Sequence, residues 1–343
     1  MKRSATITAA AAAFAFAGGW LYQRLGQRRD EHRFPPPGRL VDIGGRRLHV
    51  MLRTGTGGRG PVVVVLPALG TPALEWRQVF DALPENITAS AVDRGGIGWS
   101  DPAPRRPRTP LALADEVTAL LDALELTSVV LVGHSYGGIV ARVVAARNPD
   151  RIVGLVLVDS SHEDQMRALA AADPAISANE LWWNAARRQA RPLGWVRARH
   201  DLGGRRRLIR EAADEVGARM APAAAARTLT TARRRAAVGE LLGLAVAPRV
   251  TPARARRLGD LPMTVLTVGD GHGWEPAAYP VWLDLQRSFL AMSTDSRQLV
   301  LNGTGHHMNH DVPDQVAAAI VDLVTQIREG TRPKNSEPGE LSD

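Results

Sequence analysis

The chain has 343 residues, and its 43 lysines and arginines outnumber its 35 acidic residues to give a net charge of +8. With 45% hydrophobic residues, a chain of this length can bury one sizeable core and a smaller appendage. It has no cysteine, which excludes disulfides, a thiol nucleophile and a thiolate metal site.

The N-terminal segment carries an uncharged, alanine-rich stretch at residues 5–22, preceded by Lys2 and Arg3. This stretch is just long enough to span a bilayer. A cleaved signal peptide fits the same basic start and short apolar core, and a soluble alanine-rich helix is the remaining alternative. We therefore expect residues 1–34 to be a membrane anchor or a signal segment, which predicts a membrane-associated protein or, after cleavage, a secreted one.

Apolar runs and turns alternate regularly after this segment. The predicted strands are 39–43, 47–53, 62–66, 88–92, 128–132, 153–158, 263–268 and 297–301. The predicted helices between them are 74–83, 110–124, a segment ending near 147, and 313–328. Continuous apolar strands separated by helices predict an α/β fold with a mostly parallel central sheet and helices on both faces.

Residues 161–260 interrupt this alternation, because they contain helical stretches but no convincing strand. They hold 19 arginines against 10 acidic residues and therefore carry the charge excess of the chain. Such a surface could attract anionic lipid headgroups or acidic substrates, or could be an ordinary solvated exterior. No recognition motif or aromatic platform accompanies the arginines, so we expect no nucleic-acid partner.

The segment Gly133-His134-Ser135-Tyr136-Gly137 lies between an apolar strand and a helical pattern. This context is typical of a nucleophile elbow, in which a serine is held on a sharp strand-to-helix turn. Glycines flank the turn because a Cβ there would clash with the tight backbone. The pattern therefore predicts Ser135 as a nucleophile.

A histidine-rich loop at 303–313 follows the last predicted strand. A loop in this place can bring a base to the serine, because the triad of such folds runs serine, acid, histidine along the chain. His306, His310 and Asp311 could instead form a metal cluster, but the serine machinery explains the loop without one. We therefore expect no metal and no cofactor.

Four motifs in this order resemble the α/β-hydrolase superfamily, in its serine-nucleophile, capped form, over about residues 39–329. They are the elbow, the turn at 93–101, the segment 158–162, and the Gly305-His306 pair, whose loop is closed by Pro313. The turn at 93–101 is similar to the family's Asp-Arg-x-Gly-x-Gly-x-Ser pattern. The resemblance implies a hydrolase core at 35–160 and 261–329, with a helical lid at 161–260 inserted after the strand that follows the nucleophile helix. Composition predicts a disordered tail at 330–343.

The resemblance also implies roles for single residues. His306 is the general base that activates Ser135, and Asp270 is the acid that orients His306. Asp159 is the alternative acid, because some capped relatives carry it at the end of the preceding strand. The N–H groups of Tyr136 and Leu69 are expected to form the oxyanion hole. The family usually has His-Gly where this chain has Pro67-Ala68, and proline has no N–H to donate.

These residues predict a hydrolase that cleaves a carboxylic ester or a related acyl compound through an acyl-enzyme on Ser135. The expected partner is a small, apolar acyl substrate. A serine nucleophile argues against epoxide hydrolase and haloalkane dehalogenase chemistry, which use aspartate on this scaffold. The alternatives are an acyltransferase, a cofactor-free peroxidase or an amidase with the same triad, and a non-catalytic ligand receptor on the same fold.

Overall fold

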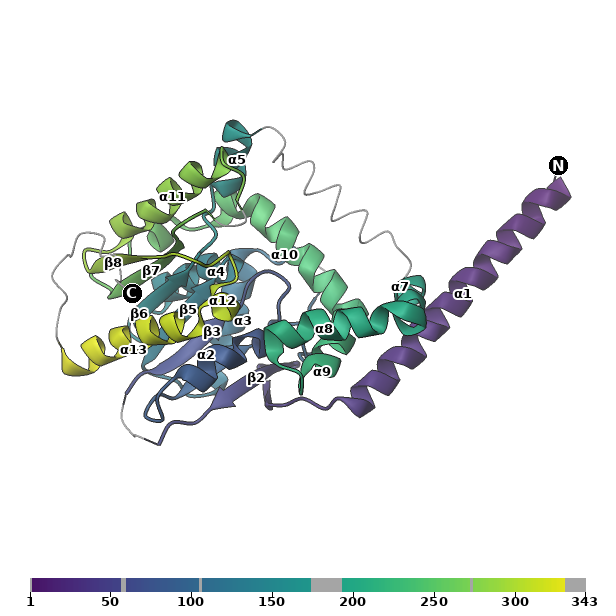
Figure 1. The fold of residues 1–343 in the computed structure, drawn as a ribbon, viewed down its shortest axis with the longest axis horizontal. Helices are drawn as coiled ribbons and strands as arrows, with labels where there is room; N and C mark the ends of the chain where they lie inside the picture. The colour runs from purple at the N-terminus through teal and green to yellow at the C-terminus, as the bar shows by residue number, and fades with distance from the viewer. Residues whose placement is uncertain (1, 57–59, 105–106, 174–192, 272–273, 331–343) are drawn as a thin grey trace.

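The computed structural model describes residues 2–56, 60–104, 107–173, 193–271 and 274–330, with side chains from residue 13 onward. An eight-stranded sheet in the order β1-β2-β4-β3-β5-β6-β7-β8 forms its centre (Figure 1). The strands are β1 (Arg39–Asp42), β2 (Arg47–Arg53), β3 (Val62–Leu66), β4 (Ala89–Val92), β5 (Val129–His134), β6 (Ile152–Val158), β7 (Met263–Val268) and β8 (Ser296–Leu301).

The sheet is antiparallel at one edge and parallel elsewhere. β1 pairs with β2 and β2 with β4 in antiparallel register, whereas every pairing from β4 to β8 is parallel. The turn between β1 and β2 uses Gly44 and Gly45, whose φ angles of 91° and 86° suit glycine. Because the parallel strands share one direction, the loops that carry chemistry meet at their carboxyl ends.

Helices cover both faces of the sheet, as predicted. α3 (Pro110–Ala123) and α4 (Tyr136–Arg147) pack on one face, and α2 (Arg77–Ala82) and α13 (Pro313–Glu329) pack on the other. Side chains alternate between these faces, so Val64 joins the α3/α4 core while Val63 and Val65 join the α2/α13 core. The prediction of a mostly parallel sheet between two helical layers is therefore confirmed.

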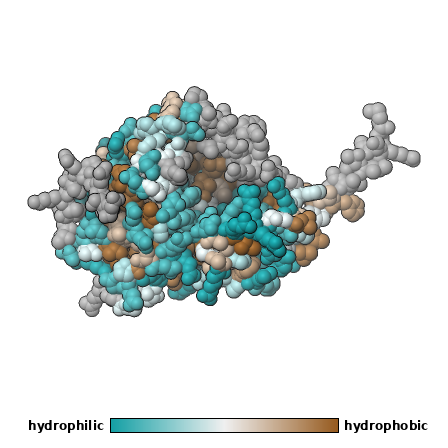
Figure 2. Space-filling view, viewed as in Figure 1, coloured by the Kyte–Doolittle hydropathy of each residue, from teal (hydrophilic) through white to brown (hydrophobic). Residues whose placement is uncertain are grey.

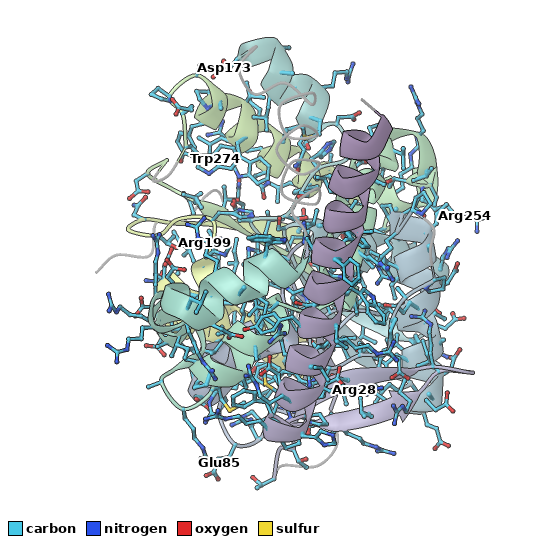
Figure 3. All side chains as sticks on the ribbon, turned by 90° about the vertical axis from the view of Figure 1, so that its right-hand side faces the viewer. Arg28, Glu85, Asp173, Arg199, Arg254 and Trp274 are labelled. Atoms are coloured by element: carbon cyan, nitrogen blue, oxygen red, sulfur yellow. The ribbon has the colours of Figure 1, made fainter. Side chains whose placement is uncertain are left out.

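The helical insertion, residues 161–260, connects β6 to β7, and its described part contains no strand. Its elements are α5 (Gln165–Ala172), α7 (Leu193–Arg199), a π-helical turn η3 (His200–Gly204), α8 (Arg205–Val216), α9 (Ala221–Thr228), α10 (Thr231–Val250) and a 3-10 turn η4 (Ala253–Arg256). Hydrophilic residues dominate the surface over α8 (Figure 2). At the other end of the insertion, α5 packs against α11 (Ala278–Ser288), near the labelled Asp173 and Trp274 (Figure 3).

The remaining elements are short or terminal. A 3-10 turn η1 (Ala73–Trp76) precedes α2, so the single helix predicted over 74–83 is broken in two. A second 3-10 turn η5 (Phe289–Met292) precedes β8, and α12 (Met308–Asp311) precedes α13. The predicted tail beyond Gly330 lies outside the described residues.

Helix α1 (Lys2–Arg33) docks its C-terminal half on the insertion and projects its N-terminal half away from it (Figure 1). Arg197 of α7 is 1% exposed; its Nη1 lies 2.6 Å from Asp30 Oδ2, and its Nε donates to Gln23 Oε1 at 3.1 Å. The helices cross closely where Gly19 meets Gly194, since a Cβ on Gly194 would overlap the Gly19 carbonyl. The docked half of α1 is therefore part of the packed structure of the insertion.

The expectation of a membrane anchor at residues 5–22 is wrong. Among the described helices, none combines the length and the apolarity that crossing a membrane requires. Alanine contributes little hydropathy, and α1 continues past Tyr22 through Arg24 and Arg28 rather than ending at the uncharged stretch. The predicted membrane-associated localisation is withdrawn for that reason.

Replacing Asp30 by alanine should destabilise the docking of α1. The change leaves the Arg197 guanidinium buried without its charge partner, which costs about 3–5 kcal/mol. Hydrogen exchange at the amides of α7 should therefore accelerate in the full chain. Arg207→Ala is the control, because its partner Glu211 lies with it on the exposed surface of α8, and such a surface pair is worth about 0–1 kcal/mol. Equal exchange in the two variants would contradict the role of the buried pair.

Candidate active site

Ser135 lies at the sharp turn between β5 and α4. Its φ of 52° and ψ of −122° are rare for a residue other than glycine, and such strain costs about 1–3 kcal/mol. The turn is tight on both sides: a Cβ at Gly133 would come within 2.6 Å of the Gly138 Cα, and a Cβ at Gly137 would overlap the Leu66 carbonyl oxygen. This geometry is that of a nucleophile elbow.

The backbone of Ser135 is fixed by the neighbouring strand, while its hydroxyl has no strong partner. The Ser135 amide donates to the carbonyl of Val158 at 3.2 Å, and the Ser161 amide donates to the Ser135 carbonyl at 2.9 Å. The Ser135 Oγ lies 3.4 Å from the Ser161 Oγ, which is long for a hydrogen bond between hydroxyls. Ser135 is also partly exposed, so its hydroxyl is available to an incoming molecule.

His306 and Asp159 form a close pair beside the elbow. The His306 Nδ1 lies 2.6 Å from the Asp159 Oδ2, and the Asp159 side chain is completely buried whereas that of His306 is one-third exposed. A carboxylate on Nδ1 favours the tautomer that carries its proton there, which leaves Nε2 as the basic nitrogen. The pair therefore has the arrangement of the acid and base of a catalytic triad.

Asp159 is itself held in place from several directions. It follows β6 directly with a φ of 36°, and its amide donates to the carbonyl of Leu266 at 2.8 Å. The indole Nε1 of Trp282 donates to the second carboxylate oxygen, Oδ1, at 2.8 Å. With each oxygen engaged by a different ring, the carboxylate cannot rotate without losing a buried hydrogen bond.

Asp270, the first choice as acid, has a different position. It is exposed, and its Oδ2 accepts a hydrogen bond from the Gly303 amide at 2.9 Å. This contact joins the loop after β7 to the loop after β8. The residue that the structure places against the His306 Nδ1 is the alternative, Asp159, because β6 ends next to the elbow strand β5.

His134, next to the serine, supports the backbone of the histidine loop. Its Nε2 lies 2.8 Å from the carbonyl oxygen of His306, so it donates a proton there. Burial lowers the pKa of His134 well below its usual value, and the nearby His306 lowers it further. His134 is therefore neutral and links the elbow to the loop that carries the base.

The histidine loop is also shaped by Asp311, whose Oδ2 accepts from the Gly305 amide at 2.8 Å. His310 faces another way, with its Nε2 3.7 Å from the Glu75 Oε2. Over the part of the chain that the structure describes, no three acidic or histidine side chains assemble as a metal site would need. Within this loop, it is therefore His306 that faces the elbow region, where it contacts the buried carboxylate of Asp159.

The backbone N–H groups of Tyr136 and Leu69, the candidate oxyanion donors, have no acceptor among the described residues. Tyr136 begins α4, where the first amides of a helix have no intrahelical partner. Leu69 lies in the turn after β3, between Gly70, whose amide donates to Glu240 Oε2 at 2.8 Å, and Ala68. This turn contacts the elbow, since the Leu66 carbonyl borders Gly137. The two unengaged N–H groups are those that the sequence suggested for an oxyanion hole.

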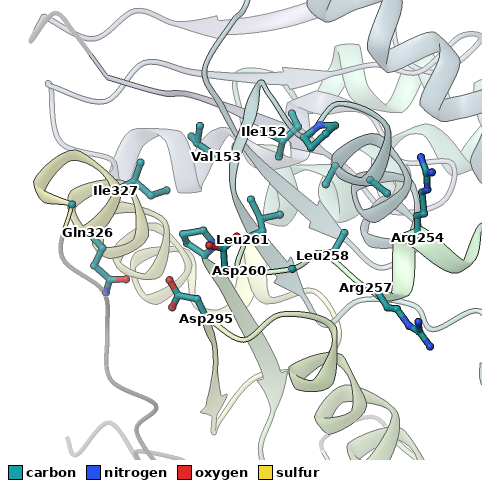
Figure 4. A pocket seen from close by; sticks show the side chains of 16 residues that line it. Ile152, Val153, Arg254, Arg257, Leu258, Asp260, Leu261, Asp295, Gln326 and Ile327 are labelled. Atoms are coloured by element: carbon teal, nitrogen blue, oxygen red, sulfur yellow. The ribbon is translucent and has the colours of Figure 1, made fainter.

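A separate pocket of about 790 Å³ lies at the opposite end of the strands (Figure 4). Ile152 and Val153, at the start of β6, line it together with Asp260, Leu261 and Ile327. Ser135 lies at the carboxyl end of β5, so the length of the sheet separates this pocket from the elbow. The pocket therefore has no part in chemistry at Ser135.

Several residues of the site carried no recognisable signal in the sequence. Trp282, which holds Asp159, lies on α11, and Glu240, which holds Gly70, lies in the insertion. Each reaches the site from more than 100 residues away along the chain. Asp159 differs from these residues, because the sequence analysis named it as the alternative acid from its place at the end of a strand.

Known proteins share this architecture. Residues 61–209 match the family model described as alpha/beta hydrolase fold. The 2-hydroxymuconate semialdehyde hydrolase of Pseudomonas sp. (strain CF600) is 35% identical over 86 residues, which are 25% of this chain and 30% of that protein. The chain spans only 18% and 30% of the lengths of the first curated relatives that it matches.

Two solved structures extend the likeness over most of the chain. The enol-lactonase from Burkholderia xenovorans LB400 superimposes with a TM-score of 0.57 at 20% identity, covering 84% of this chain and 100% of that one. The haloalkane dehalogenase DbeA from Bradyrhizobium elkani has a TM-score of 0.57 at 18% identity, covering 85% and 98%. At these identities the superpositions establish the shared fold.

Replacing each candidate acid in turn should separate their roles. Asp159→Asn should lower kcat on an activated ester about 10³–10⁴-fold, because an amide no longer holds the productive tautomer of His306. Asp270→Asn, which alters an exposed loop contact, should stay within about threefold of the parent. Steady-state kinetics of the two folded variants make the comparison. The opposite ranking would assign the acid to Asp270.

Stability should depend on pH through His134. Its folded-state pKa is lowered, so the unfolded chain binds its proton first and the free energy of unfolding falls as pH drops below about 6.5. His134→Gln, which keeps an N–H donor, should reduce that slope by up to about 1.4 kcal/mol per pH unit. Urea titrations between pH 7.5 and 5 measure both slopes. Burial also lowers the pKa values of His162 and His307, but the parent and the His134→Gln variant both contain these residues. Equal pH slopes of the free energy of unfolding in the two proteins would therefore refute the role of His134.

Proposed function

This chain belongs to the α/β-hydrolase superfamily, and we propose that it is a serine hydrolase that cleaves a carboxylic ester or a related acyl compound through an acyl-enzyme on Ser135. The observation that carries the proposal is the His306–Asp159 pair at 2.6 Å beside a serine in a strained elbow. A serine hydroxyl is a poor nucleophile at neutral pH unless a positioned base removes its proton. The paired imidazole supplies that base.

The reaction begins when Ser135 Oγ attacks the acyl carbonyl carbon and His306 Nε2 takes the hydroxyl proton. Asp159 stabilises the imidazolium that forms, and the indole of Trp282 keeps the carboxylate in its orientation. The N–H groups of Tyr136 and Leu69 donate to the oxyanion of the tetrahedral intermediate. Collapse of this intermediate expels the alcohol, which receives the proton from His306.

Deacylation repeats these steps with water as the nucleophile. His306 takes a proton from water, the hydroxide attacks the ester of Ser135, and the second tetrahedral intermediate uses the same two N–H donors. The carboxylic acid leaves as Ser135 regains its proton. The cycle uses residues at the elbow, the turn after β3, the end of β6, helix α11 and the histidine loop.

The identity of the nucleophile favours acyl chemistry over substitution at saturated carbon. Attack by serine on an epoxide or a haloalkane carbon would form an ether, which water does not readily cleave, whereas an acyl ester of serine hydrolyses. The structural neighbour named a haloalkane dehalogenase therefore shares the scaffold and, on this argument, not the reaction. The neighbour named an enol-lactonase acts on an ester bond and is the nearer chemical precedent.

A burst assay tests the proposal on the full chain. With excess p-nitrophenyl butyrate, one equivalent of p-nitrophenol should appear rapidly if deacylation limits turnover, and a fluorophosphonate probe should label one site per chain. Ser135→Ala should abolish both signals. Ser161→Ala is the matched control, because its hydroxyl lies 3.4 Å from that of Ser135, and it should retain labelling.

The alternatives give different results in the same assay. A folded parent that is neither acylated nor labelled would overturn the proposal in favour of a ligand receptor. Faster product release on addition of an alcohol, with formation of the new ester, would identify an acyltransferase. Labelling that survives in Ser135→Ala would place the nucleophile at another residue.

A further inference from the structure

A buried carboxylate from the helical insertion reaches the turn that follows β3. Glu240, near the middle of α10, is 0% exposed, and its Oε2 accepts a hydrogen bond from the Gly70 amide at 2.8 Å. Gly70 has a φ of 68°, so the turn takes a conformation that suits glycine at this position. The carboxylate therefore holds the residue next to Leu69, whose N–H faces no acceptor among the described residues.

Arg94 binds both Glu240 and this turn. Its guanidinium binds Glu240 through two contacts, Nε to Oε1 at 2.7 Å and Nη2 to Oε2 at 2.9 Å. The same guanidinium donates to the carbonyls of Pro67 and Ala68 at 2.6 and 2.7 Å. The peptide groups on both sides of Leu69 are thus fixed by one ion pair, half of which comes from the insertion.

The same helix also supports the second candidate oxyanion donor. A Cβ at Gly243 of α10 would come within 2.5 Å of the Tyr136 hydroxyl, so the helix and the tyrosine are in close contact. The Tyr136 hydroxyl donates to the carbonyl of Arg108 at 2.7 Å. On the other side, Ala237 of α10 borders Gly70, where a Cβ would lie 3.0 Å from the Ala237 Cβ. Helix α10 therefore packs against the side chain of Tyr136 and against Gly70, the neighbour of Leu69.

Stability alone does not account for this arrangement. Burying two charges costs several kcal/mol per ion, and a hydrophobic pair of similar volume is often as stable. What the ion pair supplies, and an apolar pair would not, is a set of directed bonds to three peptide groups of one turn. Such bonds fix positions to within tenths of an ångström, and a misplacement of about 1 Å can cost about 100-fold in rate.

We propose that Glu240 is a positioning residue for catalysis: through Arg94 and Gly70 it holds the turn after β3 so that the Leu69 N–H points at the oxyanion. The oxyanion hole is then complete only when α10 of the insertion is seated on the core. This inference rests on the proposed serine hydrolase function. It makes the insertion a structural part of the catalytic centre.

The variant Glu240→Gln tests the inference in the full chain. Its one amide oxygen can replace Oε2, but its NH2 group then faces the Nε of Arg94, a donor against a donor, and the charge of the pair is lost. The turn is therefore held less firmly, and kcat for p-nitrophenyl butyrate should fall about 10–100-fold while KM stays within about twofold. The affinity for an alkyl boronic acid, which forms a tetrahedral adduct with the serine, should fall by the same factor as kcat. A merely structural role would lower stability and leave the ratio of boronate to substrate affinity unchanged.

Glu116→Gln is the matched control. Glu116 is also a buried carboxylate, lies 2.6 Å from Arg46 and 3.2 Å from Arg108, and accepts from the Gly95 amide, but it makes no contact with residues 67–70. We expect it to lose stability while kcat and boronate affinity stay within about threefold of the parent. Equal kinetic losses in the two variants would overturn the special role of Glu240.

A second variant covers the case in which Glu240→Gln does not fold. Glu240→Asp keeps the charge beside Arg94 but withdraws the carboxylate from the Gly70 amide, and it should also lower kcat and boronate affinity together. If a folded Glu240 variant binds the boronic acid as tightly as the parent does, the inference is overturned. The hydrolase proposal would still stand in that case, provided that labelling depends on Ser135. Absence of labelling in the parent would instead remove the proposed function itself.

Discussion

Close backbone packing at Ser135 is the constraint on which the site depends. The positive φ of this serine occurs in a turn in which Gly137 contacts the Leu66 carbonyl and Gly138 lies against Ser160. These contacts draw the ends of β3, β5 and β6 together at one point. Because three strands end there, the nucleophile, the buried Asp159 and the turn after β3 become neighbours without any long connecting loop.

Buried ion pairs then join the insertion to this centre. Glu163, just after β6, binds Arg142 of α4 and, at 2.7 Å, Arg256 of η4, so one carboxylate holds the first and last turns of the insertion. Burial acts to raise the pKa of Glu163, but the charge of Arg142 outweighs it and the pKa is about 2. The carboxylate is therefore ionised at neutral pH. Together with the Arg94–Glu240 pair, it makes the insertion a fixed neighbour of α4.

The sequence was sufficient for those features that depend on local pattern. Apolar runs located all eight strands to within one or two residues, and the glycine pattern around Ser135 predicted a strained turn that the structure has. His306 was predicted from its place in the loop after the last strand, and the structure pairs it with the buried Asp159. Each of these features depends on a few adjacent residues, whose effects survive in any tertiary context.

Features that depend on tertiary contacts were not predictable in the same way. Two carboxylates, Asp159 and Asp270, both follow strands, and only the packing of Trp282 and the order of the strands bring the first against His306. The uncharged stretch at 5–22 suggested a membrane segment, but Gly19 and Tyr22 at its end, and Gln23 and Asp30 beyond it, make the contacts that dock α1. The contact of Trp282 with Asp159 and the contacts of α1 with Arg197 have no sequence signature, because each joins residues more than 100 positions apart.

The docking of α1 also has a mechanical consequence. A helix of 32 residues is about 48 Å long, and here its polar contacts with the insertion begin at Tyr22 and end near Asp30. These bonds join α1 to α7 and η3, so α1 cannot change its tilt without moving α7 with it or breaking the buried Arg197–Asp30 pair.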